Sequence, residues 1–461
     1  MAEPSFWLQV PKRLKKLRIS KDFGISKVSI ILSYWEVAKL KRAFFIFCII
    51  SIFVIGFFGK TVEIVFWTHE DPNRTPLEER YIQEFQKMYP EVKITRVTYP
   101  SARIREVVLT AFAARKGPDI FNMEIQDAYP YIINQRVAPV DLKAINLSNY
   151  DALLDEYVEG TLDPVLYEDK IYGLPLEITN WCLYINKKYF REVGLDPEKD
   201  YPKTWEDIVT ISEKLVLREG EILLRRGFDF RYPYYFTEWL PLVEQLGGAL
   251  FSEDGQTAII NDDAWLKALQ FMKEWGPNGK NLGSPTYQPA RNEFNRDNNT
   301  VTMCMSGLYQ IDRIKAQNPD FYESEEWMVV PFPVFENAVN EVKCNYYGHY
   351  YMVNAESSKE KQEYAWKFIN FMLSHSDEYL TNCGLIQPKK ALLESEVFKN
   401  YPYADVFLSD LEKSHSVPLH PKGPQFEQLI REAIESVMLT TTTPEQALNV
   451  LKRKANELLQ E

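Results

Sequence analysis

The chain of 461 residues is longer than one hydrophobic core usually organises, because such cores stop growing near ~250 to 300 residues. Its 45% apolar and 26% charged residues exclude an intrinsically disordered chain and predict a folded body of two domains. The first 59 residues hold ten Lys or Arg and three acids, which leaves the remainder of the chain with a formal net charge near −19. Such a field argues against nucleic-acid binding by the main body.

A basic cluster, Lys39–Arg42, precedes seventeen almost wholly apolar residues at 43–59. This order predicts that residues 1–59 are an N-terminal extension followed by an export signal or anchor. The apolar run is longer than the ~7 to 15 residues of a usual signal core and shorter than the ~20 of a spanning helix, so cleavage and retention both stay open. Residues 1–38 also leave two alternatives: a translation start near residue 37 or 40, or a basic cytoplasmic extension before the anchor.

Strand and helix patterns alternate after the apolar run. Thr75, Pro76 and Glu78 predict the capped start of a helix that continues to Met88. The expected order is strand, helix, strand, helix, strand, at 61–67, 75–88, 92–97, 103–116 and 119–123. This alternation predicts a largely parallel sheet.

Two polar loops follow strands of that expected sheet. They are Thr68–Asp71 after the first strand and Glu124–Asp127 after the third. Ligands of such sheets bind beyond the carboxyl ends of the strands, so both loops are candidate binding loops. The alternative is ordinary solvated loop chemistry, with Asp71 capping a turn before Pro72.

Later segments carry the apolar stripes of core helices. One face includes Ala365, Phe368 and Met372, and Thr443 begins a capped helix at the C-terminal end. No low-complexity linker separates the two domains, so we expect the chain to pass between them more than once.

The five cysteines, at 48, 182, 304, 344 and 383, lack the spacing of a metal site or a disulfide scaffold. Cys304 lies in an apolar run that predicts a buried strand, where Cys acts as a small hydrophobe. We therefore expect no metal and no cofactor. A disulfide among the last four cysteines stays an open alternative.

The segment from Asp169 reads DKIYGLPLEITNWCLYINKKYFREVGLDPEKDYPKTWEDI. It resembles the extracellular solute-binding proteins of ABC sugar importers, the maltose-binding-protein-like family, in Tyr172–Pro175, Ile185–Lys187 and Pro202–Asp207. Ile185 stands where the family has Tyr. Thr302–Tyr309 is similar to a further family segment, with Tyr309 in place of the usual Trp. The resemblance covers residues 60–461.

The resemblance implies an α/β, two-lobed periplasmic-binding-protein fold. Each lobe would be a mostly parallel sheet flanked by helices, joined by hinge crossings near Glu177–Asn180 and Asn345–Gly348. The implied N-terminal lobe comprises residues 60–177 and 347–410. The implied C-terminal lobe comprises residues 178–346 and 411–461.

A sugar presents flat C–H faces ringed by hydroxyls, so its site needs aromatic rings and planar hydrogen-bonding groups. The expected aromatic contacts, several of them at positions where family members touch ligand, are Trp67, Trp181, Tyr235, Trp239, Tyr309, Tyr346 and Tyr347. The expected polar contacts are His69, Asp71, Glu124, Asp127, Thr179 and Asn180. Any single aromatic residue is more often a core or surface residue than a ligand contact.

The family implies a non-catalytic function. We expect an exported binding protein that captures a mono- or oligosaccharide and delivers it to the permease subunits of an ABC importer, as a monomer. Phosphorylated or strongly anionic ligands are not expected, because no basic cluster accompanies the aromatic loops. The alternatives are a glycan-acting enzyme with paired carboxylates and a membrane-anchored sensor.

Overall fold

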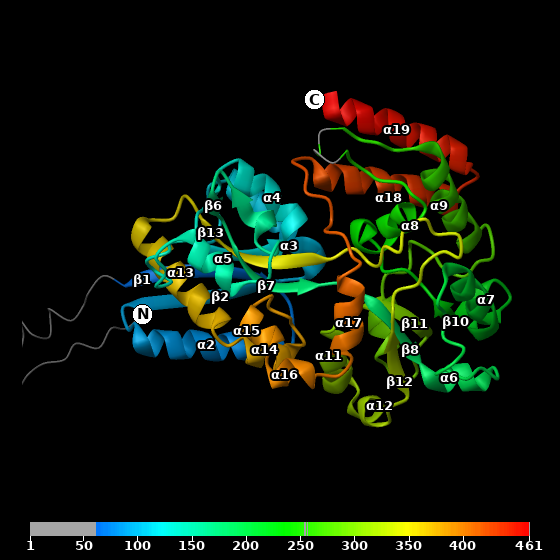
Figure 1. Cartoon of the computed structure of the whole chain (residues 1–461), viewed down its shortest axis with the longest axis horizontal. Coiled ribbons are helices and arrows are strands. Elements are labelled where there is room, and N and C mark those ends of the chain that lie inside the picture. The colour runs from blue at the N-terminus through cyan, green and yellow to red at the C-terminus, as the bar shows by residue number, and fades with distance from the viewer. Residues whose placement is uncertain (1–60, 253–254, 256, 461) are drawn as a thin grey trace, which may run out of the picture. The chain divides into compact units, whose positions relative to one another are not determined.

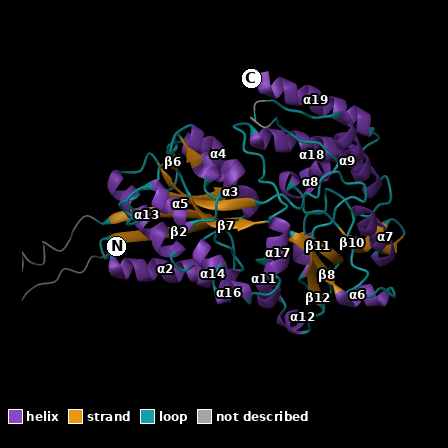
Figure 2. Cartoon of the chain, viewed as in Figure 1, coloured by secondary structure: helices purple, strands orange, loops and turns teal. Residues whose placement is uncertain are grey.

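Two mixed β-sheets organise the part of the chain that the structure describes (Figures 1 and 2). This computed structural model describes residues 61–252, 255 and 257–460. The predicted signal or anchor at 43–59, and the extension before it, lie outside the described residues. From Val62 onward the chain forms one compact unit.

The first sheet has the strand order β2-β1-β3-β13-β4, and β7 also pairs with β13. Its strands are β1 (Val62–His69), β2 (Val92–Tyr99), β3 (Ile120–Glu124), β4 (Val137–Ala138), β7 (Leu174–Thr179) and β13 (Tyr347–Asn354). β1 runs parallel to β2 and β3, whereas β13 runs antiparallel to β3, β4 and β7.

The second sheet has the order β12-β8-β11-β10-β9. Its strands are β8 (Cys182–Asn186), β9 (Leu217–Glu219), β10 (Ile222–Phe228), β11 (Val301–Ser306) and β12 (Trp327–Val330). Only β10 and β11 pair in parallel. A short hairpin of β5 (Leu166–Tyr167) and β6 (Lys170–Ile171) stands apart.

The expectation of mostly parallel sheets is wrong in both cases. In the first sheet, His349 of β13 pairs with Glu124, the last residue of β3. The chain therefore enters β13 at the edge where β1 and β3 end, coming from the second sheet, and must run in the opposite direction. Repeated passage between the sheets thus produces mixed pairing.

The helices surround both groups of strands, as Figure 2 shows. From residue 61 onward the described part of the chain begins with α2 (Arg74–Met88), α3 (Ser101–Ala113), α4 (Ile125–Ile133), α5 (Tyr150–Glu156), α6 (Lys187–Glu192), α7 (Trp205–Leu215), α8 (Leu240–Gln245), α9 (Asp262–Trp275), α10 (Ala290–Phe294), α11 (Gln310–Gln317), α12 (Pro319–Glu323), α13 (Lys359–Leu373), α14 (Ser376–Cys383) and α15 (Lys390–Leu393). The last four are α16 (Glu396–Lys399), α17 (Ala404–Leu411), α18 (Gly423–Leu439) and α19 (Pro444–Gln460). A 3-10 turn covers Asp163–Val165 and a π turn covers Tyr235–Trp239.

Aromatic rings hold helices on both faces of the first sheet. Phe66 on β1 packs against Phe368 of α13 at 6.2 Å between ring centroids, and Phe368 also meets Phe85 of α2. Phe121, on the opposite face because side chains alternate along strands, packs against Phe112 of α3. Helices α2 and α13 therefore cover one face, and α3 covers the other.

Helices also surround the second sheet. Trp205 of α7 stacks on Phe230 at 5.5 Å, and α18 and α19 pack on α9. α17, which ends at Leu411, packs on β8. The lobe boundary predicted at residue 410 therefore falls within a helix that contacts the second sheet, and the predicted boundaries stay a proposal.

The two predicted helix caps have different outcomes. At α19 the side chains of Thr443 and Gln446 each accept from the other's backbone N–H, which confirms the cap. The cap predicted at Thr75 is wrong. Asp71 Oδ1 accepts from the backbone N–H groups of Asn73 and Arg74 and starts α2 earlier.

No helix in the described ranges is long and apolar enough to cross a membrane.

Candidate functional site

A cavity of about 160 Å³ lies where strand ends of the first sheet face α11 and the loop after β10. Its lining residues are His69, Glu70, Asp71, Pro72, Ser101, Glu124, Glu177, Arg231, Tyr234, Arg291, Tyr309, Arg313, Gln317, Tyr347, His349 and Leu385. Most of these side chains carry a charge or a hydroxyl. The lining is therefore suited to a polar solute.

Asp71 joins the two sides of this cavity. Its Oδ1 caps the amides of α2, and its Oδ2 accepts from Arg313 Nη2 at 2.7 Å. Burial alone would raise the pKa of Asp71, but Arg313 and Arg74 hold it below the ordinary value. Asp71 is thus a carboxylate at neutral pH and fixes Arg313 in the cavity wall.

A buried ion cluster supports the loop after β1. The Arg74 guanidinium donates to Thr68 Oγ1 at 2.6 Å and to the His69 carbonyl at 2.7 Å. Glu78 pairs with Arg74 at 3.3 Å and with Arg96 at 2.7 Å. Because these groups are buried and paired, they hold His69 and Asp71 in place.

The first-sheet wall carries two carboxylates around a histidine. His349 Nδ1 lies 2.8 Å from Glu177 Oε1, and its Nε2 lies 3.8 Å from Glu124 Oε1. His69 packs beside His349, with 4.4 Å between ring centroids. Burial, with the nearby cation Arg74, lowers the pKa of His69, so that ring is neutral at pH 7. This wall offers acceptors for ligand hydroxyls.

The opposite wall is aromatic and cationic. Arg231 Nη1 donates to Tyr309 Oη at 3.0 Å, and its guanidinium stacks on Trp181 at 3.8 Å from the ring centroid. Arg313 lies over the Tyr309 ring at 4.5 Å. Tyr234 packs edge-to-face against Trp181, 5.2 Å between ring centroids, and its ring also lies 5.0 Å from the Arg231 guanidinium. Rings and guanidinium planes therefore fix one another.

Gly307 permits the close packing behind Tyr309. A Cβ at this position would lie 2.5 Å from Thr179 Oγ1 and 2.5 Å from Tyr309 Cε1. Any larger residue would push the ring or β7 out of place. The Thr179 side chain and the Tyr309 ring can both approach residue 307 this closely only because it is glycine.

The structure brings five of the thirteen predicted contact residues together at the cavity. They are His69, Asp71, Glu124, Tyr309 and Tyr347. Trp181 lies behind Arg231 as its stacking partner. Thr179 is buried beside Gly307, and Asn180 Nδ2 donates to the Phe407 carbonyl at 3.0 Å. These three residues support the cavity from behind.

Five predicted residues lie away from this cavity. Trp67 packs edge-on against Tyr99, and Trp239 packs against Trp265 in the core, 2% exposed. The others are Tyr235 in the π turn, Tyr346 in a bridge to Ser416, and Asp127 in a second cavity.

Several lining residues were missed by the sequence predictions: Glu177, Arg231, Tyr234, Arg291, Arg313 and His349. Three carried a usable signal. Arg231 interrupts the aromatic run FDFRYPYYF, His349 interrupts the strand YYGHYYMV, and Arg313 follows Tyr309 by one helical turn. Glu177 was predicted only as part of the hinge at Glu177–Asn180, and Arg291 carried no signal that we can identify.

The expectation that no basic cluster accompanies the aromatic residues is wrong. Arg231, Arg291 and Arg313 line the cavity beside Tyr309. They are spread over residues 231–313 in sequence, so only folding brings them together. The sequence therefore gave no valid reason to exclude an anionic ligand from this cavity.

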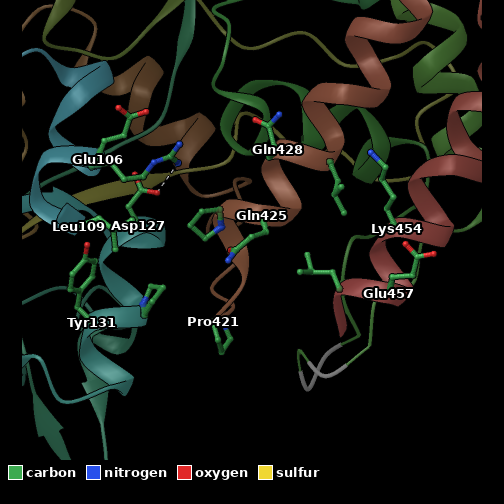
Figure 3. Close-up of a pocket in the computed structure, with 14 residues that line it drawn as sticks. Glu106, Leu109, Asp127, Tyr131, Pro421, Gln425, Gln428, Lys454 and Glu457 are labelled. Atoms are coloured by element: carbon green, nitrogen blue, oxygen red, sulfur yellow. Dashed lines mark hydrogen bonds and ion pairs between the residues drawn. The ribbon is translucent and has the colours of Figure 1, made fainter. Parts of the chain in front are cut away.

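A second, larger cavity of about 660 Å³ lies between α3 and α4 on one side and α18 and α19 on the other (Figure 3). Asp127 accepts there from Arg105 at 3.1 Å. Figure 3 shows Lys454 on the far side of the cavity from Asp127. Leu109, in the same lining, is 58% exposed. The smaller cavity holds the buried, mutually fixed polar groups, so we take it as the candidate ligand site.

Cys182, Cys304, Cys344 and Cys383 are free and buried. Among the described residues no group of three or more His, Cys, Asp or Glu is placed to hold a metal ion.

Comparison with known proteins identifies the class. The chain belongs to the family described as bacterial extracellular solute-binding protein, whose model matches residues 71–378. This confirms the predicted family, which is non-catalytic and serves ABC transporters outside the cytoplasm. The chain is thus an ABC transporter solute-binding protein, and an enzymatic function is set aside.

Individual relatives are distant. The chain is similar to a solute-binding protein from Thermotoga lettingae solved with alpha-D-tagatose, with a TM-score of 0.75, 19% identity, and coverage of 87% of this chain and 100% of that one. It is 20% identical to the maltotriose-binding protein of Pyrococcus abyssi over 82% of this chain and 77% of that protein. It is 24% identical to the sn-glycerol-3-phosphate-binding periplasmic protein of Shigella dysenteriae over 62% and 66%. The structural match confirms the two-lobed fold.

Proposed function

We propose that this protein captures a carbohydrate between its two lobes and delivers it to the permease subunits of an ABC importer. The observation that carries the proposal is the cavity itself, in which Tyr309 from one lobe faces Glu124 and Glu177 from the other. A ring face and planar acceptors are the groups that a sugar requires.

The size of the cavity favours a small ligand. At about 160 Å³ it falls below the ~300 to 1,000 Å³ of pockets for drug-sized molecules. A solute of about one sugar ring suits it better than an oligosaccharide does. The tagatose complex of the Thermotoga lettingae protein supports a ligand of this size.

The remaining features of the proposal concern the protein's surroundings. We propose that it acts as a monomer outside the cytoplasmic membrane and that the apolar segment at 43–59 directs its export. We further propose that residues 60–177 and 347–410 form one lobe, and that residues 178–346 and 411–461 form the other. Whether the segment is removed or retained as an anchor can be read from the mass of the mature protein.

The experiment is a thermal-shift screen of the purified protein against a panel of mono- and oligosaccharides together with their acid and phosphate derivatives. A ligand that binds only the folded state stabilises it by RT ln(1 + [L]/Kd), or about 2.7 kcal/mol at a hundred times Kd. We expect a monosaccharide to raise the melting temperature and to be recovered unchanged by chromatography. Steady product formation would contradict the proposal, as would a panel without any stabilising sugar.

A further inference from the structure

Arg231 is a buried cation without an anionic partner. It is 8% exposed and lines the cavity, yet no carboxylate of the described residues lies within 4.0 Å of its guanidinium. Its contacts are the Tyr309 hydroxyl at 3.0 Å and the faces of Trp181 at 3.8 Å and Tyr234 at 5.0 Å. These contacts orient the guanidinium but leave its charge unbalanced.

The carboxylates nearby do not supply the missing charge. Asp71 is paired with Arg313, and Glu177 is paired with His349. Glu238 accepts from the backbone N–H of Arg231, but burial raises the pKa of this carboxyl to about 8, so it is mainly protonated at pH 7. Arg291, the next cation in the lining, donates to Asn292 and likewise has no carboxylate partner among the described residues.

A neutral ligand would increase the energetic cost of burying the unpaired Arg231 cation. Closing a cavity over an unpaired cation removes its remaining water without offering a countercharge, and a buried charge is costly unless it is paired. An oxyanion would instead accept two parallel hydrogen bonds from the planar guanidinium. The opposite wall, with Glu124, Glu177 and His349, would repel an anion and accept hydroxyl groups.

We infer that the solute captured here is a hydroxylated molecule with one anionic group, a carboxylate or a phosphate, which Arg231 binds while its hydroxyls face Glu124 and Glu177. This inference rests on the proposed function and names the charge of its ligand. It fits a sugar acid or a sugar phosphate, and it replaces the sequence-based expectation of a neutral sugar.

The test uses matched neutral, carboxylate and phosphate probes at equal ionic strength. Two series are suitable: galactose, galacturonate and galactose 6-phosphate, and glycerol, glycerate and glycerol 3-phosphate. We expect a charged member to raise the melting temperature of the full-length protein at concentrations where its neutral counterpart does not. Whether the carboxylate or the phosphate is preferred identifies the anionic group.

A substitution then assigns the recognition to Arg231. Arg231→Gln should weaken binding of the charged member about 30- to 100-fold, and Arg231→Lys should weaken it less because the charge remains. The matched control is Arg225→Gln, which removes a cation of β10 that pairs with Glu192 of α6 and lies outside the cavity. It should bind as the wild type does.

The two proposals fail in different ways. A neutral sugar that binds as tightly as its acid or phosphate overturns this inference and supports carbohydrate capture. Equal loss of neutral and charged ligands in Arg231→Gln gives Arg231 a structural role and also overturns it. If no charged or neutral member binds, both proposals are contradicted.

Discussion

At the level of single residues, Tyr309 is held in the candidate site by two arginines. Its ring is 5% exposed, lies under the Arg313 guanidinium, and accepts a hydrogen bond from Arg231 at its hydroxyl. The ring is thus held from two sides before any ligand arrives. Such rigid aromatic groups are typical of positions that contribute most to binding.

We predict that Tyr309→Ala weakens ligand binding by roughly 2 kcal/mol, or about thirtyfold in Kd, at a temperature where the variant is folded. Because the ring is buried, the same change should also cost about 3 to 5 kcal/mol of folding free energy. Tyr309→Phe keeps the ring face and should bind within a few fold of wild type. Calorimetric titration and urea unfolding measure both quantities.

Trp239→Phe is the control for this prediction, because Trp239 packs on Trp265 and does not line the cavity. It should lower stability and leave affinity unchanged. Tyr309→Ala that binds as the wild type does would remove Tyr309 from the site.

The sequence indicated some of these residues and not others, for a physical reason. Asp71, Glu124 and Tyr309 directly follow strands or precede a helix, so their places at the sheet edge could be predicted. Arg231 lies in an irregular loop, and Arg313 reaches the cavity through a pair with Asp71, 242 residues away in sequence. The sequence offers Arg231, within an aromatic run, and Arg313, one helical turn after Tyr309, as candidates, but pairing over such a distance leaves no local pattern that places either residue at the cavity.

At the scale of elements, the loop after β1 and helix α11 are joined by the Asp71–Arg313 ion pair. Asp71 lies between β1 of the first sheet and α2, and Arg313 lies on α11, which follows β11 of the second sheet. Both side chains are largely buried, at 4% and 13% exposure. The ion pair therefore contributes to the contact between the two lobes.

We predict that acid weakens this contact. The folded-state pKa of Asp71 is below its ordinary value near ~3.9, so the stabilisation is complete above that value and is lost as the pH falls through the folded pKa. Asp71→Asn should cost on the order of 1 to 3 kcal/mol at pH 7, since it leaves Arg313 without its partner. Urea unfolding at pH 7, 5 and 3 measures the difference.

Between pH 5 and pH 3, Asp71→Asn should therefore lose less stability than wild type. Asp263→Asn, which removes an exposed pair with Lys267 on α9, is the control and should follow the wild-type curve. Parallel pH curves for Asp71→Asn and wild type would show that the pair contributes nothing.

At the scale of the whole molecule, the chain passes between the sheets at Thr179 to Cys182 and again before Tyr347. Tyr347 pairs with Thr179, so the two crossings are hydrogen-bonded neighbours. Adjacent crossings of this kind can act as a hinge, because a few residues absorb the rotation of one lobe against the other.

We predict that a saturating ligand compacts the protein, because contacts from both lobes are completed only when they enclose it. Small-angle scattering should show a smaller radius of gyration with ligand than without. An identical scattering curve in both states would exclude closure as the mechanism of capture.

The family and the two-lobed fold could be predicted from the sequence, because short motifs such as Tyr172–Pro175 and Pro202–Asp207 survive at low identity. The direction of the strands could not be predicted from the sequence. Helical and strand periodicity report which face of an element is buried, and they carry no information on the edge at which the chain re-enters a sheet. Only the pairing of β13 with β3 and β7 resolves that.

We expect the solute to bind in the smaller cavity and not in the larger one. Ser101 lines the first and Leu109 the second, both on α3, so Trp at either position fills one cavity. Calorimetric titration of the stabilising ligand into Ser101→Trp and Leu109→Trp tests this most directly. We expect at least a thirtyfold loss of affinity in Ser101→Trp and wild-type affinity in Leu109→Trp, and the reverse pattern would contradict the account.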